Sequence, residues 1–347
     1  MWWNKAERGA RYGRTFPGSR IVLAILVVAF LLFIVWQGGR MRREIGPRTV
    51  TVYCFSALEE AMVERILPAF GDSWSRATGE HVEFITTFAG SGTITDRIIG
   101  KFPAEVAILS SEMDALRLVR RGVLPGPTWR TSPHAGVFAR SPMVIRVREG
   151  NPRGISSFED LAGEGVSLIQ ANPATSGAGE WAMLAVYGSE LRASGDRERA
   201  AELLRRVWRN VAAEEPSARL LRARFEGGMG DAVITYEADA LGRASQGGVR
   251  GEAVLPRGTI VSEPMIAAIS RNVAAEQKAL VDSLVAFFWS GAAQEILVEH
   301  GFRSVDEARN AGNPRFLPAE NSFRLKDIGG AGRAQAEVLD KSWRESD

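Results

Sequence analysis

The chain of 347 residues is long enough for about two domains. Its 45% hydrophobic and 24% charged residues are typical of a globular protein and exclude a disordered or collagen-like chain. Residues 1–48 contain nine Lys or Arg and two acidic residues and carry +7, so the total of +2 leaves −5 for the rest. This mildly acidic body argues against a nucleic-acid-binding surface, which would present a clustered basic face.

An apolar segment of membrane-spanning length lies near the N-terminus. Residues 21–36 are all apolar, and the stretch stays uncharged to residue 39. Such a segment is a transmembrane helix or a long signal-peptide core, but no small-x-small cleavage pattern follows it. We therefore expect an uncleaved anchor at residues 21–39, preceded by a cytoplasmic basic arm at residues 1–20. The body would then lie in the periplasm or the extracellular space.

From residue 48 onward, segments with strand and helix patterns alternate. Residues 48–55 form the first predicted strand, and a helix follows in which Ser56 and Glu59 have capping-box spacing and Pro68 introduces a bend. The only cysteine, Cys54, lies in that strand; it has no partner for a disulfide within the chain, and we expect it to be buried.

Later segments repeat the alternation. Strands are predicted within residues 81–88, 104–110, 142–152, 165–173, 223–241 and 262–270. Helices are predicted within residues 89–100, 111–122, 157–163, 179–191 and 275–301. Alternation of this kind indicates parallel sheets with helices on their faces, and the chain is too long for one such sheet. We therefore expect two α/β lobes.

Three predicted strand-to-helix turns consist of unusually small residues: Ser56–Ala57, Ala89–Thr93 and Thr175–Gly179. A helix N-terminus presents unpaired N–H groups and a partial positive charge, and small side chains let an oxyanion approach them. One such turn is ordinary chain geometry, but three together indicate an anion site at the carboxyl ends of the strands. The Gly-Lys-Ser/Thr ending of a nucleotide P-loop is absent.

An enzyme is the alternative, with Ser176 as nucleophile and His81, His134 or His300 as its base. The residues around Ser176 do not form the Gly-x-Ser-x-Gly elbow of hydrolases, and His81 and His300 fit surface or capping positions. The sequence shows no metal-ligand spacing. We expect a protein that is not an enzyme and has no bound metal.

Several motifs, in chain order, resemble the sulfate- and thiosulfate-binding proteins of bacterial ABC importers. They are FAGSGTITDRIIG, REGNPRGISSFEDL, NPATSGAGEWAMLAVYG, VWRNV, PSAR, FEGGMGDAVITYEADAL and TIVSEP. The resemblance runs from about Val50 to near the C-terminus. It implies the type II periplasmic-binding-protein fold, an α/β fold whose two lobes close on the ligand. Lobe one would comprise residues 49–138 plus 260–347, and lobe two residues 139–259.

In that family a dehydrated sulfate is held by neutral donors, namely backbone N–H groups at helix starts, a serine hydroxyl and an indole N–H. The resemblance implies the ligand-binding residues Ser91, Ser176, Gly177, Ala178, Ala218, Tyr236 and Ala57. Ala178 departs mildly from the family's Ser-Gly-Gly, because a backbone N–H is still offered, and two further positions depart, of which Tyr236 affects ligand preference or affinity. Tyr236 stands where the family has tryptophan, and the family's aspartate is missing near Ala57.

No Asp or Glu lies inside the matched turns, since Asp96 and Glu180 fall beyond them. A site without a carboxylate suits a dianion that has no proton to give, which favours sulfate or thiosulfate over phosphate. Molybdate and tungstate remain alternative ligands. The resemblance implies an ABC permease and ATPase as partners, a monomer, and no cofactor or nucleic acid. Because of the predicted anchor, a membrane-anchored anion sensor of the same fold is also an alternative.

Overall fold

The computed structural model describes residues 22, 25–34, 48–241 and 251–342. The chain divides into two units, residues 1–47 and residues 48–347. Within the first unit, residues 25–34 form an apolar helix, while the rest of the predicted anchor and the arm at residues 1–20 lie outside the described residues, apart from Val22. Among the described helices, none is by itself long and apolar enough to cross a membrane. One pair, Ala275–Phe287 and Gly291–Glu299, reaches that length and composition with a bend of 53° between its halves.

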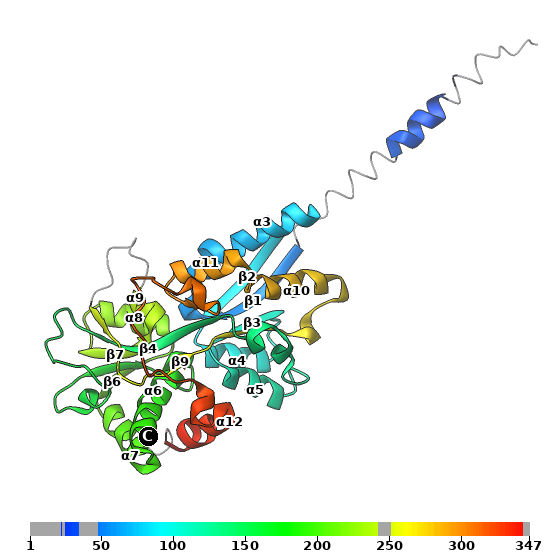
Figure 1. The fold of residues 1–347 in the computed structure, drawn as a ribbon. Helices are drawn as coiled ribbons and strands as arrows, with labels where there is room; N and C mark the ends of the chain where they lie inside the picture. Colours follow the sequence, from blue (N-terminus) through cyan, green and yellow to red (C-terminus); the bar gives the residue numbers. More distant parts are fainter. Residues whose placement is uncertain (1–21, 23–24, 35–47, 242–250, 343–347) are drawn as a thin grey trace, which may run out of the picture. The chain divides into compact units, whose positions relative to one another are not determined.

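In the residues that the structure describes, the second unit is built on two sheets (Figure 1). The first sheet has the strand order β10-β3-β1-β2 and defines the first lobe. Its strands are β1 (Arg48–Phe55), β2 (Val82–Ala89), β3 (Val106–Leu109) and β10 (Met265–Ala268). The second sheet has the order β11-β4-β7-β5-β6, with β8 and β9 also paired to β4, and defines the second lobe. Its strands are β4 (Ala139–Val147), β5 (Leu168–Ala171), β6 (Val211–Glu215), β7 (Ala232–Tyr236), β8 (Glu252–Val254), β9 (Val261–Ser262) and β11 (Arg303–Ser304).

Both sheets repeat one arrangement, and it corrects the expectation of purely parallel sheets. In each lobe three strands are parallel, β2-β1-β3 and β6-β5-β7, and a fourth strand runs antiparallel beside the last of them. The parallel strands are joined by helical crossovers, as parallel pairing requires. The fourth strands, β10 and β4, are instead reached by chain that arrives from the other lobe, so no crossover fixes their direction.

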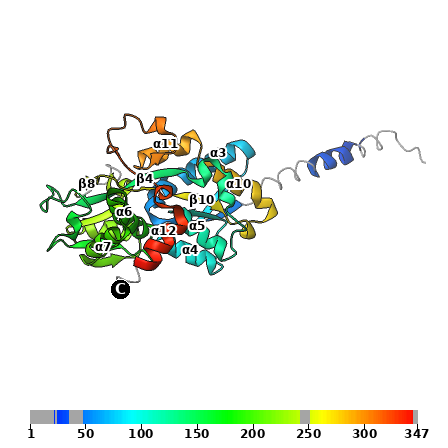
Figure 2. The same cartoon turned by 60° about the horizontal axis from the view of Figure 1, so that its bottom comes forward.

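Helices cover both faces of each sheet, as Figures 1 and 2 show. In the first lobe, one face carries the segments from η1 to α3 together with α10 and α11, and the other carries α4 and α5. These elements are η1 (Ser56–Leu58), α2 (Glu59–Ala61), the π-helical η2 (Met62–Ile66), α3 (Leu67–Thr78), α4 (Ser91–Ile99), α5 (Glu112–Arg120), α10 (Lys278–Phe287) and α11 (Gly291–Glu299).

In the second lobe, α6 and α7 lie on one side of the sheet and α8 and α9 on the other (Figure 1). Their bounds are α6 (Gly177–Ser194), α7 (Arg197–Trp208), α8 (Ala218–Glu226) and α9 (Glu237–Leu241). The remaining short helices are η3 (Thr128–Thr131), η4 (Pro133–Gly136), η5 (Asp160–Ala162), η7 (Ser270–Asn272), η8 (Ala275–Gln277), η9 (Glu307–Arg309), η10 (Leu325–Ile328), α12 (Gly330–Ala334) and η11 (Gln335–Ser342).

The first predicted helix is confirmed as a helical stretch, but its predicted cap is wrong. The chain leaves β1 directly into the 3-10 turn of η1, so Phe55 occupies the capping position and no side chain caps the turn. Helical structure continues through Pro68, as expected, because Pro68 stands in the first turn of α3. A π turn precedes it, in which the N–H of Leu67 donates to the carbonyl of Met62.

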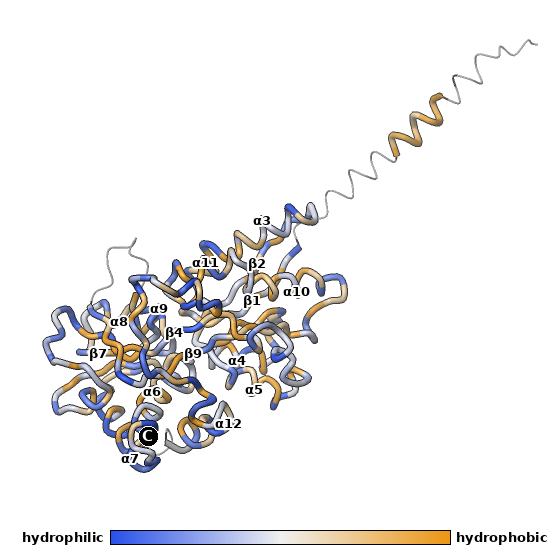
Figure 3. The backbone as a smooth tube through the Cα atoms, in the orientation of Figure 1, coloured by the Kyte–Doolittle hydropathy of each residue, from blue (hydrophilic) through white to orange (hydrophobic). Residues whose placement is uncertain are grey.

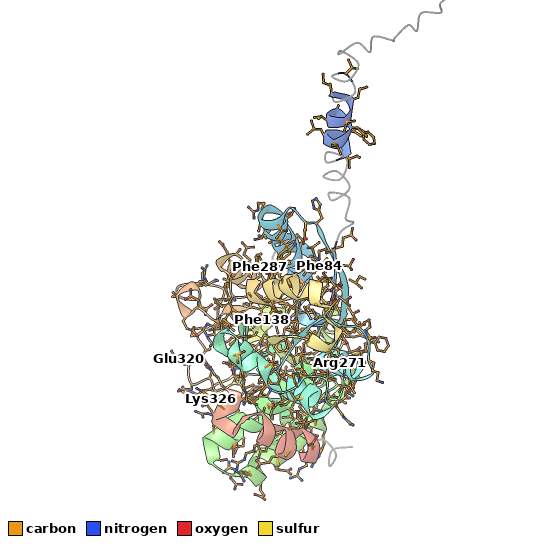
Figure 4. All side chains as sticks on the ribbon, turned by 90° about the vertical axis from the view of Figure 1, so that its right-hand side faces the viewer. Phe84, Phe138, Arg271, Phe287, Glu320 and Lys326 are labelled. Carbon is orange, nitrogen blue, oxygen red and sulfur yellow. The ribbon has the colours of Figure 1, made fainter. Side chains whose placement is uncertain are left out.

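The buried apolar residues come from the strands and from the helices that cover them. Figure 3 colours the hydrophobic residues along the backbone of the body orange. Cys54 is fully buried, as predicted, and burial raises the pKa of its thiol. Phe70 of α3 packs against Phe84 and Phe287, whose ring centres lie 6.2 and 5.5 Å away (Figure 4). This contact ties α3 and α10 to the same side of the first sheet.

Two antiparallel segments connect the lobes. Ser141 of β4 pairs with Ser262 of β9, and Val137 forms a bridge with Met265, the first residue of β10. The predicted lobe boundaries, 138/139 and 259/260, fall in or beside these segments, and the domain limits stay a prediction. After α11 the chain returns to the second sheet, where β11 pairs with β4.

Candidate anion-binding site

Helices α4, α6 and α8 each begin just after a strand of one of the two sheets. Their N-cap residues are Gly90, Ser176 and Ser217. The first N–H groups of each helix have no acceptor one turn earlier and share the positive end of the helix dipole. The small residues at these starts therefore leave backbone donors open to a ligand.

The three helix starts meet between the lobes. A Cβ atom on Gly90 would lie 2.2 Å from the carbonyl oxygen of Thr175 and 2.5 Å from that of Pro216, so only glycine fits there. The N–H of Thr93 donates to the Thr175 carbonyl over 3.1 Å. The start of α4 in the first lobe thus contacts the turns before both α6 and α8 in the second.

Gly177 faces the first lobe at close range. A Cβ atom built on it would lie 1.7 Å from Oγ of Ser110 and 3.3 Å from Cβ of Ser91. One turn further along α6, the indole N–H of Trp181 donates to the Ser110 carbonyl over 3.0 Å. The two predicted glycine turns therefore lie opposite each other, with Ser91 and Ser110 against the start of α6.

Most predicted ligand-binding positions are buried at this junction. The buried ones are Ser91, Ser176, Gly177, Ala178, Ala218 and Tyr236. Ala57 is half-buried and lines a pocket of about 270 Å³ together with Ser56 and Arg219. The structure thus brings the first six positions to one interface and places Ala57 at the adjoining pocket; what they bind stays a prediction.

Tyr236 presents a phenol that no described group satisfies. Its ring meets the ring of Phe55 edge-on at 6.3 Å, and its buried hydroxyl makes no hydrogen bond in the described part of the chain. Burial, and then the charge of Asp239, raise the pKa of Tyr236 well above its ordinary value. The Ser110 hydroxyl lies near enough to lower that pKa, but it forms no hydrogen bond of good geometry with the phenol. The phenol is therefore protonated at neutral pH and able to donate.

The expectation of a site without carboxylates is wrong, because Asp114 lies directly behind Ser91. The Ser91 hydroxyl donates to Oδ2 of Asp114 over 2.5 Å and accepts the N–H of Ser110 over 2.9 Å. Asp114 also accepts from the Thr95 hydroxyl at 3.1 Å. Asp114 comes from α5 and lies outside every matched turn. A signal was available in Ser110–Ser111, a further small turn that follows the third strand.

Burial shifts two carboxyl groups toward their protonated forms. It raises the pKa of Asp114, an effect opposed by the hydrogen bond from Ser91 and by the charge of Arg117. The pKa of Glu180 is raised further, first by burial and then by the negative charge of Asp114. Arg117 pairs with Asp114 at 3.4 Å and with Asp96 at 2.7 Å. Oε2 of Glu180 is buried and has no hydrogen-bond partner among the described residues.

Whether the Ser91 hydroxyl can donate to a ligand depends on whether Asp114 is protonated. When Asp114 is ionised it accepts the only hydrogen of that hydroxyl, so none remains for a ligand. When Asp114 is protonated it can donate to Oγ of Ser91, and the serine hydrogen is then free to point at an anion. Protonation also removes a negative charge that would repel the anion in a buried site.

The histidines do not complete a catalytic arrangement with Ser176. His81 and His134 are exposed, and in the part of the chain that the structure describes Ser176 makes no hydrogen bond to a histidine. His300 occupies the C-cap position of α11, one of the two positions expected for it, and is buried, with 7% of its surface exposed. Just after it, Gly301 approaches Ala238 of the second lobe, where an added Cβ atom would lie 3.2 Å from Cα of Ala238.

Two α/β lobes whose helix starts face one another define a class, the binding proteins that enclose a small solute between their lobes. Comparison with known proteins agrees with that class. The chain belongs to the bacterial extracellular solute-binding protein family, whose model matches residues 50–303.

Individual relatives match over two thirds of the chain or more. The chain is 28% identical to the sulfate-binding protein of Synechococcus elongatus, over 92% of this chain and 93% of the relative. It is 28% identical to the thiosulfate-binding protein of Pseudomonas aeruginosa, over 68% of this chain and 72% of that protein. The solved structure of the sulfate-binding protein SubI from Mycobacterium tuberculosis superimposes with a TM-score of 0.76 at 25% identity, covering 84% of this chain and all of SubI.

Proposed function

We propose that this protein is an extracytoplasmic solute-binding protein that captures sulfate or thiosulfate and delivers it to an ABC importer. The observation that carries the proposal is the approach of Gly177 to Ser91 and Ser110, which sets two helix starts face to face across the lobes. The family membership and the names of the sulfate- and thiosulfate-binding relatives support the same ligand class.

In this proposal the ligand is held by neutral donors. The donors are the Ser176, Ser91 and Tyr236 hydroxyls and the backbone N–H groups of Gly177, Ala178, Ala218 and Ala57. Hydrogen bonds to an ion are stronger than neutral ones, and a closed site with low dielectric strengthens them further. The unpartnered Tyr236 phenol supports this reading, because a buried hydroxyl without a partner is costly unless a ligand satisfies it.

The partners in this proposal are a membrane permease and its ATPase, which would recognise the closed monomer. Contacts that would hold the closed form are visible: Arg219 of α8 donates twice to the carboxylate of Glu59, at 2.7 and 2.6 Å. This pair joins the two lobes at the edge of the pocket that Ala57 lines.

The ligand assignment is tested by calorimetric titration of the purified full-length chain with sulfate, thiosulfate, molybdate and phosphate at two pH values. We expect one site that binds sulfate or thiosulfate most tightly. Ser176→Leu should abolish that binding without changing the thermal unfolding midpoint, whereas Ser73→Leu, on the exposed side of α3, should leave it intact. If sulfate, thiosulfate and molybdate all fail to bind, the proposal is wrong. If phosphate binds most tightly, the assignment of sulfate or thiosulfate as the ligand is wrong.

We further propose that residues 21–39 remain attached and anchor the body outside the cytoplasm. Mass spectrometry of the protein extracted from cell membranes should then recover peptides from residues 1–20. Recovery of only a shortened chain in the soluble extracytoplasmic fraction would identify the segment as a removed signal. Loss of sulfate uptake on deletion of the gene separates a transport role from an anchored sensor, which would leave uptake unchanged.

A further inference from the structure

Three side chains with metal-ligand chemistry meet in the first lobe, outside the anion site. Glu60 of α2, Glu64 of η2 and His300, which follows α11, each place one potential ligand atom within 4.8 Å of the others. Glu60 is half-buried, Glu64 is exposed and His300 is buried. No sequence spacing predicts this group, because His300 is distant from both glutamates in the chain.

The hydrogen bonding of His300 defines which nitrogen is available. Nδ1 lies 2.8 Å from the carbonyl oxygen of Ile296, so Nδ1 carries the proton and donates. Nε2 of the neutral ring is then left with a lone pair, and it is buried without a hydrogen-bond partner in the described residues. This is the arrangement of a metal-ligating histidine, whose second nitrogen donates to a carbonyl or carboxylate and so fixes the tautomer.

The glutamates are positioned to complete the same site. Glu60 and Glu64 are four residues apart on a continuous helical stretch, so their side chains project from one face. Oε1 of Glu60 is also buried and unpartnered among the described residues. Among the described residues, Nε2 of His300 forms no hydrogen bond with either glutamate. The stretch contains the π turn Met62–Ile66, and π turns are common at functional sites.

The surrounding charge suits a cation. The cluster lines the pocket of about 270 Å³ that also contains Glu59, Asp239, Arg219 and Arg222. Among the described lining residues there are four carboxylates and two guanidinium groups, and the guanidinium group of Arg219 is bound by Glu59. The pocket leaves room for water to complete a coordination shell.

We propose that Glu60, Glu64 and His300 bind a divalent transition-metal cation such as Zn²⁺, with water from the pocket as the remaining ligand. An imidazole nitrogen with two carboxylate oxygens favours such a cation over Mg²⁺ or Ca²⁺, which prefer oxygen ligands alone. The site uses none of the buried anion-site residues, although Ala57 lines the same pocket.

The test is calorimetric titration of the full-length chain with ZnCl₂ after treatment with a chelator, in buffer without sulfate. We expect saturable binding of one Zn²⁺ per chain, and X-ray absorption should report one imidazole among mainly oxygen ligands. Glu64→Gln, at an exposed position that does not endanger the fold, should weaken binding at least about tenfold, and His300→Gln should do the same. His134→Gln, which removes an exposed histidine elsewhere, is the matched control and should bind Zn²⁺ like the unaltered chain.

The proposal is overturned if Zn²⁺ shows no saturable binding, if Glu64→Gln leaves the affinity unchanged, or if His134→Gln lowers it as much. Titration of the same samples with sulfate, thiosulfate and molybdate keeps the two sites distinguishable. A chain that binds sulfate or thiosulfate but not Zn²⁺ overturns this inference alone, and a chain that binds Zn²⁺ but none of the three anions overturns the proposed function alone.

Discussion

Ser91, the first residue of α4, and Ser176, the N-cap of α6, each lie at the start of a helix that follows a strand of its lobe's sheet, yet their hydroxyls have different surroundings. The Ser91 hydroxyl is bound on both sides, by Asp114 and by the Ser110 N–H. The Ser176 hydroxyl caps nothing at the start of α6 and makes no hydrogen bond in the described structure. In the second lobe it is Ser217 that caps its own helix, through the N–H of Leu220.

The difference indicates that the lobes contribute to the site in unlike ways. The second lobe offers a serine hydroxyl and helix N–H groups that are ready for an anion without rearrangement. The first lobe offers a serine whose hydrogen is held by a buried carboxylate, so its contribution depends on a proton on Asp114. The following predictions test this contrast, beginning with the contact on which both halves depend.

Gly90→Ala should have the largest effect, a loss of sulfate affinity of about 100-fold. The added Cβ would collide with the carbonyls of Thr175 and Pro216 and hold the lobes apart, at the overpacking cost of about 3 kcal/mol. The thermal unfolding midpoint should change little, because an open form relieves the collision. Gly126→Ala is the matched control, since a Cβ there meets nothing within 4 Å. Equal affinities for the two variants would show that closure does not need the Gly90 contact.

Ser176→Ala should weaken sulfate binding by about 10- to 100-fold, the worth of one hydrogen bond to a charged group. At pH 8, Ser91→Ala should weaken it far less, because the hydroxyl that is lost was already donating to Asp114. Titration of both variants at pH 8 and pH 5 checks the contrast, and the gap between them should narrow at the lower pH. Equal losses at pH 8 would show that the two serines contribute alike.

How far these features follow from the sequence depends on whether they are local. Local sequence patterns predict the positions of most strands and helices, the burial of Cys54 and the small turns at Ser91 and Ser176. The structure confirms these features. Asp114 was not predicted, because an acid in the first turn of α5 is indistinguishable from one that stabilises a helix N-terminus in solvent. Only the packing of α4 on α5 buries it. His300 caps α11 as expected, but its burial was not predicted, because burial depends on packing that a local pattern does not show.

The proton on Asp114 should make sulfate affinity fall as pH rises. Burial raises the pKa of Asp114 in the free protein, and a bound dianion must raise it further, so binding takes up a proton between these two pKa values. Affinity should be constant below the lower pKa, decrease by up to about tenfold per pH unit between the two, and be constant again above the upper one. Glu180, Arg117, Asp96 and Tyr236 are the other ionisable groups near this carboxyl.

Asp114→Asn should flatten that pH dependence, because an amide carries no titrating proton and can donate permanently to Ser91. Asp72→Asn, on the exposed side of α3, is the control and should keep the slope of the unaltered chain. Sulfate titrations from pH 5 to pH 9 measure both. If the sulfate affinity of the unaltered chain is independent of pH, the Ser91 hydroxyl donates to the ligand whether or not Asp114 is protonated, and the prediction is wrong.

Glu59→Gln should have the smallest effect, a reduction in sulfate affinity of about two- to fivefold. Glu59 and Arg219 join the lobes through two short hydrogen bonds, but 59% of the Arg219 side chain is exposed, and exposed ion pairs contribute little because water and salt screen them. The deficit should therefore shrink as NaCl is raised at constant sulfate. Because the pair lies at the rim, its loss should mainly speed ligand release, which stopped-flow measurement can follow. A deficit as large as that of Gly90→Ala would instead place the main closing contact at the rim and not at the helix starts.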